Sequence, residues 1–215
     1  PAYPTLAEHE LNYEDGKRKW FEEDGLKISS IGHLHKQKNH LNLVRAIEIL
    51  KNEKKINCHA IIAGEGPERN NILALINQKN LTNNVTLVGA IDNPISLIKE
   101  SDLFVLSSNY EGFGMVIVEA LSVGKTVVST DCQSGPAEII GDNEFGYLCK
   151  INDSSELAEK IDFARKNSIN PDKLITKSKE YTLEKIGPIY EEMLNKLNTW
   201  HIAICFINSI CTVII

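Results

Sequence analysis

The sequence predicts an α/β protein built on a doubly wound parallel sheet, and three observations lead to that fold class. Six short runs rich in β-branched residues recur along the chain, and helix-length amphipathic segments separate them. Each run is too short and too apolar to be a strand with one wet face, which indicates parallel strands buried on both faces. Right-handed crossovers are the common way to join such strands, so helices are expected on both faces of the sheet.

The expected elements alternate from residue 27 onward. The strands cover residues 27–34, 58–64, 85–90, 103–108, 126–131 and 146–149. Asn39 is a candidate N-cap for a helix whose Leu43, Ile47 and Leu50 lie on one face. Further helices are expected to begin at Pro67, Pro94, Gly114, Gly135–Pro136, and Asp153 or Ser154, and a last one covers residues 182–198.

Three regions are expected along the chain. Residues 1–25 are acidic and irregular and are interpreted as a lead-in or interdomain linker, without the apolar core of a signal peptide. Residues 26–199 carry the alternating pattern and form the domain. Residues 200–215 form an apolar tail with 12 apolar residues in 16, shorter than the roughly 20 that cross a bilayer. The tail either packs against protein, is foreign to the domain, or makes a weak peripheral membrane contact; it lacks the Lys and Arg typical of interfacial anchors.

Charge and cysteine content exclude several classes of protein. The formal charge is −6, from 23 Lys and Arg against 29 Asp and Glu, so sequence-independent binding to nucleic acid is not expected. The five cysteines are an odd number without a C-x-x-C pair, which argues against a disulfide framework or a structural zinc site. A reducing compartment fits best, so the expected location is the cytoplasm or the cytoplasmic face of the inner membrane.

The loops that follow the strands are where an open parallel sheet binds its ligands. After the first strand, Gly32 allows a tight turn and Lys38 stands just before the candidate cap Asn39. A lysine there can place its ammonium near the N-terminus of a helix, where main-chain N–H groups already favour an anion. A solvated lysine is the alternative interpretation of Lys38.

The segment EGFGMVIVE, residues 111–119, is the most informative motif in the chain. Gly112 and Gly114 flank Phe113, so the main chain can approach a ligand closely, and the helix that begins near Gly114 presents unpaired N–H groups to a phosphate. Glu111 and Glu119 stand on either side of this anion site. Carboxylates accept hydrogen bonds from vicinal hydroxyls, so the pattern suits a nucleotide-sugar, which carries hydroxyl-rich rings at both ends of a diphosphate.

Five motifs together resemble a known family. The E-x7-E spacing of Glu111 and Glu119, with SIGHLHKQKNH, IIAGEGPER, VTLVGAID and SGPAEII in the same order, is similar to the C-terminal lobe of glycosyltransferase family 4. The resemblance covers residues 27 to about 198. It implies a Rossmann-like lobe of a GT-B fold, in which two lobes close around the donor, and a retaining transfer of sugar to an acceptor hydroxyl.

The resemblance also implies roles for individual residues. Glu111 and Lys38 would be the catalytic pair, with Glu111 at the hydroxyls of the donor sugar and Lys38 at the departing diphosphate. Glu119 would hold the ribose. The donor sugar and diphosphate would contact Gly32, His33, Lys38, Gly112, Phe113, Gly114 and Met115, and the nucleobase would be bordered by Gly64, Gly89, Ala90 and Ile91.

Two departures from the family pattern stand out. The family usually has Arg where this chain has His33, which is mostly neutral at pH 7 from a reference pKa of about 6.5. The N-terminal lobe that binds the acceptor in the family has no counterpart ahead of the first strand, so it is expected to be missing. The chain is then interpreted as the donor half of an enzyme of polysaccharide or lipopolysaccharide synthesis, with a nucleotide-sugar donor and a glycan or lipid-linked acceptor.

Three alternatives remain at this stage. The chain is a truncated, non-catalytic nucleotide-sugar-binding module, or a sugar-nucleotide epimerase, although the E-x7-E spacing disfavours the latter. His33, His35 and His40 suggest a metal site, but only the first two share a face of the expected strand and no carboxylate or cysteine completes the set. No cofactor and no metal is expected.

Overall fold

A computed structural model of the chain describes residue 20 and residues 24–197. The chain divides into two compact units, residues 1–177 and residues 178–215, each of which is described by itself. The expected lead-in lies outside the described residues except for Trp20, Asp24 and Gly25, and the expected tail at 200–215 lies wholly outside them. The expected limits of the regions stay a prediction.

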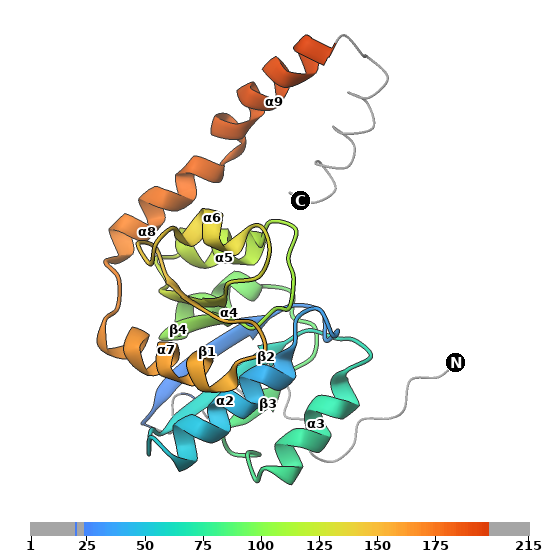
Figure 1. Ribbon diagram of the computed structural model, residues 1–215, viewed down its shortest axis with the longest axis vertical. Helices are drawn as coiled ribbons and strands as arrows, with labels where there is room; N and C mark the ends of the chain where they lie inside the picture. Colours follow the sequence, from blue (N-terminus) through green and yellow to red (C-terminus); the bar gives the residue numbers. More distant parts are fainter. Residues whose placement is uncertain (1–19, 21–23, 198–215) are drawn as a thin grey trace. The chain divides into compact units, whose positions relative to one another are not determined.

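A six-stranded sheet forms the centre of the first unit (Figure 1). Its strand order is β3-β2-β1-β4-β5-β6, and every neighbouring pair is parallel. This order reverses direction between β1 and β4, as in a doubly wound sheet, so the predicted fold class is confirmed. The strands are β1 Leu26–Ile31, β2 Cys58–Ala63, β3 Val85–Leu87, β4 Leu103–Leu106, β5 Val127–Thr130 and β6 Tyr147–Cys149.

All six strands are shorter than the sequence predicts, and most of the lost residues are at their carboxyl ends. Residues 32–34, 88–90 and 107–108 are loop rather than strand. Their main-chain N–H groups bond outside the regular pairing of the strands, as where Leu34 N–H donates to Glu65 O at 2.9 Å. The apolar pattern continues past the last hydrogen bond between paired strands, because some of these loop residues still cover the core. Hydrophobicity alone therefore overestimates strand length.

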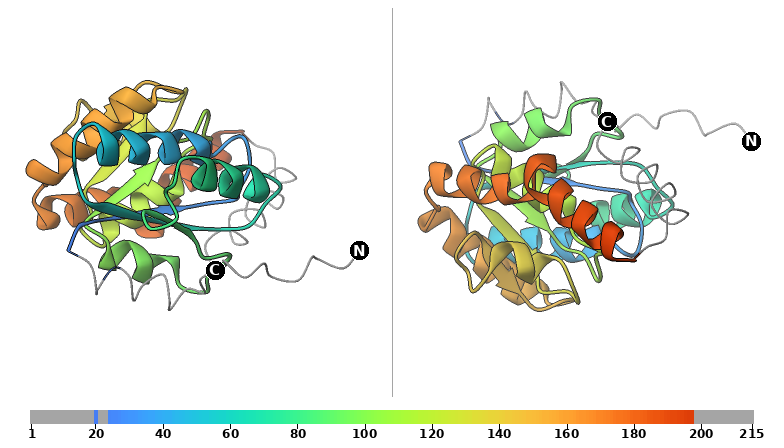
Figure 2. Two further views of the ribbon diagram at one scale, coloured as in Figure 1. Left: turned by 90° about the horizontal axis from the view of Figure 1, so that it is seen from below. Right: turned by 90° about the horizontal axis from the view of Figure 1, so that it is seen from above.

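Helices cover both faces of the sheet, as predicted (Figure 2). One layer contains α2 (His40–Asn52), α3 (Arg69–Gln78) and α7 (Ser154–Lys166), and the other contains α4 (Pro94–Glu100), α5 (Met115–Ser122) and α6 (Pro136–Ile140). From β1 the chain adds β2 and β3 toward one edge of the sheet. It then returns to the middle at β4 and adds β5 and β6 toward the other edge. Right-handed crossovers in opposite directions place the two sets of helices on opposite faces.

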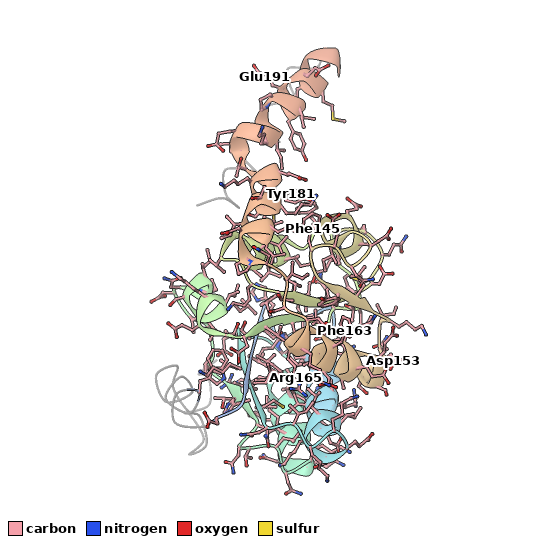
Figure 3. All side chains as sticks on the ribbon, turned by 90° about the vertical axis from the view of Figure 1, so that its left-hand side faces the viewer. Phe145, Asp153, Phe163, Arg165, Tyr181 and Glu191 are labelled. Carbon is pink, nitrogen blue, oxygen red and sulfur yellow. The ribbon has the colours of Figure 1, made fainter. Side chains whose placement is uncertain are left out.

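The larger core lies between the sheet and the layer of α2 and α7. The predicted apolar face of α2 is buried there, with Leu43, Ile47 and Leu50 fully covered beside Leu157 and Ile161 of α7. Figure 3 shows Asp153 and Arg165 at the two ends of α7, with the exposed Phe163 between them. Asp153 caps this helix as predicted, because its carboxylate accepts the Glu156 N–H at 2.9 Å.

A smaller core on the opposite face contains a residue of the expected lead-in. Trp20 is 1% exposed and packs with Ile61, Ala63 and Leu97. Its indole N–H donates to His59 O at 3.1 Å, which satisfies the polar atom of a buried ring. Trp20 therefore belongs to the core of the domain, contrary to its interpretation as part of an irregular linker.

Three helix starts differ from or extend the expectation. Asn39 occupies the N-cap position of α2 but in the left-handed conformation, with φ 44°, and its side chain makes no capping bond. The helix expected from Pro67 begins two residues later, at Arg69, because Pro67 and Glu68 form a turn. The structure adds α8 (Pro171–Ser178), which is not among the expected helices although Asn170 followed by Pro171 is a helix-start signal. By contrast, Asn93 caps α4 by accepting the Ser96 N–H at 3.0 Å.

The second unit consists of a short 3-10 helix and a long helix in its described part. The 3-10 helix covers Lys179–Tyr181, and α9 covers Leu183–Leu197, which agrees with the helix predicted over residues 182–198. Pro188 lies inside α9. Among the residues that the structure describes, none of the helices combines the length and the apolar character needed to cross a membrane.

Candidate functional site

The predicted site residues lie at the carboxyl edge of the sheet, around the point where the strand order reverses. Lys38 lies in the loop after β1 and Glu111 in the loop after β4, and these two strands are neighbours. The Lys38 Nζ atom is 2.7 Å from Glu111 Oε1, and the two side chains are 18% and 7% exposed. Ligands of open α/β sheets bind at this reversal, so the two residues proposed to be catalytic stand where a ligand is expected.

The main chain of Lys38 is fixed by its own loop and by the end of β4. Its N–H donates to His35 O at 3.0 Å, and the Ser107 hydroxyl donates to Lys38 O at 3.0 Å. Its side chain passes over Gly32, where a Cβ would come within 3.0 Å of Lys38 Cε. Gly32 therefore leaves room for the lysine stem. His33 beside it is exposed.

Glu111 is held by its carboxylate and by its main chain. Oε1 accepts the Ser108 hydroxyl at 2.5 Å as well as the Lys38 ammonium. Its main-chain oxygen accepts the Ser134 hydroxyl, from the loop after β5, at 3.1 Å. Three loops that follow three neighbouring strands thus meet at this one glutamate.

The glycines of the EGFG motif face different surroundings. A Cβ on Gly112 would meet nothing within 4 Å, so this stretch of main chain borders open space. Gly114 is the N-cap of α5 with φ 89°, a conformation that favours glycine. Phe113 is half-buried and Met115 is 41% exposed. The helix start and the open main chain at Gly112 lie on the same short segment, as the anion-site prediction requires.

Glu119 lies about one turn into α5 and is half-buried. Burial raises the pKa of its carboxyl group, and the nearby positive charge of Lys38 works in the opposite direction. Both acidic residues of the E-x7-E motif therefore lie within electrostatic range of Lys38. That the two carboxylates flank an anion site stays a prediction.

The residues expected to border the nucleobase lie in loops that are bonded to the Gly32 turn. The Gly64 N–H donates to Gly89 O at 2.7 Å, and a Cβ on Gly64 would come within 2.0 Å of Gly32 O. Gly64 has φ 145°, in the region that favours glycine. Ala90 beside them is exposed, and Ile91 is partly buried against the smaller core. The main chains of the three loops therefore lie side by side along this edge.

The histidines do not form the metal site that their number suggests. His33 and His35 lie in a loop rather than on one face of a strand, and His40 is buried at the start of α2. Within residues 24–197 and Trp20, no group of three or more His, Cys, Asp or Glu is placed to hold a metal ion. Burial and the Lys38 charge lower the pKa of His40 to about 4. The expectation that donor binding needs no metal stays a prediction.

Two serines at the site escape the sequence-based prediction. The apolar pattern places Ser107 and Ser108 at the end of a strand, yet both are loop residues whose hydroxyls contact Lys38 and Glu111. Both are buried. Two small hydroxyl residues directly after an apolar parallel strand and directly before the EGFG motif are the signal that could have identified them.

Comparison with known families gives a clear result. The profile of the family described as glycosyl transferases group 1 matches residues 13–181, most of the chain. The chain belongs to this family. A member from Campylobacter jejuni, N-acetylgalactosamine-N,N'-diacetylbacillosaminyl-diphospho-undecaprenol 4-alpha-N-acetylgalactosaminyltransferase, is 35% identical over 177 residues, which are 81% of this chain and 46% of that protein.

A second group 1 relative is the poly(ribitol-phosphate) alpha-N-acetylglucosaminyltransferase of Staphylococcus aureus. It is 32% identical over 153 residues, which are 70% of this chain and 31% of the relative. This glycosyl transferase group 1 chain thus spans less than half the length of either relative.

Solved structures agree with the fold. A mutant of S. aureus TarM, crystallised with fondaparinux, alpha-GlcNAc-glycerol and UDP, has a TM-score of 0.69 at 29% identity, over 81% of this chain and 36% of that one. The lipopolysaccharide outer core galactosyltransferase WaaB has a TM-score of 0.70 at 18% identity, over 91% of this chain and 54% of that one, a likeness of fold alone. The group 1 chain therefore has the predicted lobe of a GT-B glycosyltransferase.

Proposed function

We propose that this chain is the donor-binding half of a retaining glycosyltransferase that takes its sugar from a nucleoside diphosphate. The observation that carries the proposal is the Lys38–Glu111 ion pair at the reversal of the strand order, with Glu119 in electrostatic range of the same lysine. In a sugar nucleotide the diphosphate needs a cation, and the hydroxyls of the sugar and the ribose need hydrogen-bond acceptors. Lys38 supplies the cation, and the two carboxylates supply the acceptors.

Each charged residue then has a distinct part in the transfer. The bond between the anomeric carbon and the diphosphate oxygen breaks, and its electron pair leaves with the diphosphate. The acceptor oxygen bonds to the anomeric carbon, and its proton passes to the departing diphosphate. Negative charge develops on the departing diphosphate, where the Lys38 ammonium stabilises it. Lys38 has three N–H donors, so it can contact the diphosphate while one of them remains on Glu111. Glu111 and Glu119 accept hydrogen bonds from the donor sugar and the ribose.

The exposed main chain at Gly112 and the start of α5 complete the proposed donor site. Gly112 borders open space, so the main chain can lie against the sugar and the diphosphate. Unpaired N–H groups at the start of α5 favour the anion. The nucleobase would lie along the Gly64 and Gly89 loops, which are bonded to each other.

The relatives support a broader proposal about the product. The names of the C. jejuni and S. aureus relatives specify alpha-linked N-acetylhexosamine, and Escherichia coli WclY, 28% identical over 180 residues, is named for O-antigen biosynthesis. We therefore propose that the complete protein adds a sugar to a cell-surface polysaccharide on a glycan or lipid-linked acceptor. The expected cytoplasmic location belongs to the same proposal.

Calorimetry with UDP and GDP sugars tests the donor site. We expect the chain to bind one of the two classes, and Glu119→Ala to lower the affinity about tenfold or more by removing a charged hydrogen-bond acceptor. Glu159→Ala is the matched control, because Glu159 is an exposed glutamate on another helix, α7. Equal affinities for wild type and Glu119→Ala would refute the ribose role, and no nucleotide binding by wild type would refute the proposed function.

Donor binding without turnover is the second candidate function. It is favoured by the fact that the chain spans 46% of the C. jejuni relative. Incubation of the chain with a radiolabelled donor and a glycan acceptor separates the two functions, because labelled product shows transfer by the chain itself. A donor whose stereochemistry changes without any acceptor would instead indicate an epimerase.

A further inference from the structure

We propose that Ser108 is a positioning residue that fixes the carboxylate of Glu111 so that its second oxygen faces the donor sugar. The proposal rests on the proposed function and concerns a residue that the donor-site assignment leaves without a role. Ser108 directly follows Ser107 after β4, and its side chain is completely buried. Its hydroxyl donates to Glu111 Oε1 at 2.5 Å.

The serine is itself held in place by the neighbouring strand. The hydroxyl of Thr130, the last residue of β5, donates to Ser108 O at 2.5 Å, and Thr130 is completely buried. Ser107 is tied in the same way to the loop of Lys38, through bonds to Lys38 O at 3.0 Å and Asn39 O at 3.1 Å. The Ser108 donor therefore sits on a stretch of main chain that is anchored on both sides.

Both donors to the Glu111 carboxylate use the same oxygen. Lys38 Nζ lies 2.7 Å and Ser108 Oγ 2.5 Å from Oε1, whereas Oε2 accepts no hydrogen bond from the part of the chain that the structure describes. An ionised carboxylate has about four acceptor sites on its two oxygens. Two donors on Oε1 fix the rotation of the carboxylate and leave Oε2 available for a hydroxyl of the sugar.

The serine supplies a restraint that the lysine alone does not. The Lys38 ammonium sits at the end of a flexible four-carbon stem and, in the proposed reaction, also contacts the diphosphate. The Ser108 hydroxyl is on a short, buried side chain whose rotation is limited by packing. The Ser108 hydroxyl keeps Oε1 in place while Lys38 moves to contact the ligand. The orientation of the Glu111 carboxylate therefore stays the same whether or not Lys38 is bound to the diphosphate.

The test compares two affinities for each variant: that for a nucleoside diphosphate and that for the corresponding sugar nucleotide. UDP with UDP-N-acetylglucosamine and GDP with GDP-mannose serve as probes in calorimetry on the full 215-residue chain. The ratio of the two affinities isolates the contribution of the sugar. We expect Ser108→Ala to reduce this ratio about tenfold, the effect of losing one hydrogen bond to a charged group, while binding of the bare diphosphate changes less than about twofold.

Three further variants make the result specific. Ser29→Ala removes another completely buried hydroxyl, which contacts Ser101 at 2.9 Å rather than Glu111, and should leave the ratio unchanged. Ser108→Thr retains the hydroxyl and should restore the ratio toward wild type. In a Glu111→Ala background, which removes the acceptor, Ser108→Ala should add no further loss, because the serine acts through Glu111. Circular dichroism confirms that each variant is folded.

The possible results separate this proposal from the proposed function. A ratio that Ser108→Ala leaves unchanged, or equal losses of diphosphate and sugar-nucleotide affinity, would overturn the positioning role while the donor site stands. An additional loss from Ser108→Ala in the Glu111→Ala background would also overturn it. If wild type binds neither class of nucleotide, the proposed function fails and the positioning role fails with it.

Discussion

Lys38 Nζ and Glu111 Oε1 lie 2.7 Å apart, although 73 residues of sequence separate them. The contact joins the loop after β1 to the loop after β4, the two strands at which the sheet changes direction. Because both side chains are mostly buried, the pair is less screened by salt than a surface pair. The same contact fixes the distance between the ammonium of Lys38, proposed to bind the diphosphate, and the carboxylate of Glu111, proposed to bind the sugar.

The ion pair should contribute measurably to the stability of the domain. We expect a double-mutant cycle with Lys38→Met and Glu111→Gln, followed by urea unfolding, to give a coupling free energy of about 1 kcal/mol or more. Each single variant should be destabilised because it leaves a partly buried charge without its partner. Additive effects of the two substitutions would show that the pair does not form in solution.

Two glycines near Phe113 should respond differently to alanine. At Gly135, φ is 82° and a Cβ would lie 2.2 Å from Phe113 O, so Gly135→Ala should lower the free energy of unfolding by about 2 kcal/mol or more.

A Cβ at Gly112 meets nothing within 4 Å, so Gly112→Ala should change stability by less than about 0.5 kcal/mol. Its added methyl would nevertheless stand where the donor is proposed to bind, so sugar-nucleotide affinity should fall. Unfolding curves and calorimetry on the two variants check both expectations. Unchanged affinity in Gly112→Ala would contradict the placement of the donor.

Burial of His40 should make the stability of the domain depend on pH. Its folded pKa is about 4, lowered by burial and then by Lys38, against 6.5 for an ordinary histidine. Between these values the unfolded chain binds more protons than the folded one, so stability is fully present above about pH 6.5 and falls as the pH drops toward 4. From pH 7 to pH 5 the loss due to this residue is about 2 kcal/mol.

Comparison with His40→Leu isolates this contribution. The variant lacks the titrating group, so its free energy of unfolding should fall less than that of wild type between about pH 7 and pH 5. His35→Ala removes an exposed histidine and should behave like wild type. Parallel pH curves for wild type and His40→Leu would show that His40 is not buried in its neutral form.

Trp20 should be essential for a stable domain. The ring is 1% exposed and packs with Ile61 and Leu97, so Trp20→Ala should lower the free energy of unfolding by about 3–5 kcal/mol. Ile95→Ala, at a residue that is 40% exposed on α4, should cost much less. Urea unfolding of both variants measures the difference, and similar losses would mean that Trp20 does not occupy the smaller core.

The sequence predicts those features of the fold that depend on local patterns. The spacing of Leu43, Ile47 and Leu50 marks one face of a helix, and that face is buried in the structure. Asp153 is one of two candidate caps, with Ser154, and its carboxylate accepts the Glu156 N–H. Strand ends are predicted less accurately, because the apolar pattern continues into loops such as residues 32–34, where ladder bonds have stopped.

Features that depend on distant contacts are not predictable from one sequence. Trp20 stands in an acidic segment without periodicity, and only the sheet shows the pocket that it fills. The α8 helix is different, because its start signal is local: Asn170 caps it by accepting the Asp172 N–H at 2.8 Å, and Pro171 is its first residue. Ser108 resembles the end of a strand, and its contact with Glu111 follows from how the chain turns after β4.

The amino-acid order by itself determined that parallel strands alternate with helices and that Glu111 and Glu119 flank a glycine-rich helix start. These are properties of neighbouring residues, which periodicity and spacing record directly. Only the tertiary structure decided that Lys38 contacts Glu111, that Ser107 bonds to the main chain of Lys38, and that Ser108 bonds to the carboxylate of Glu111. Such contacts depend on the strand order, because pairing β1 with β4 brings together loops that are far apart along the chain.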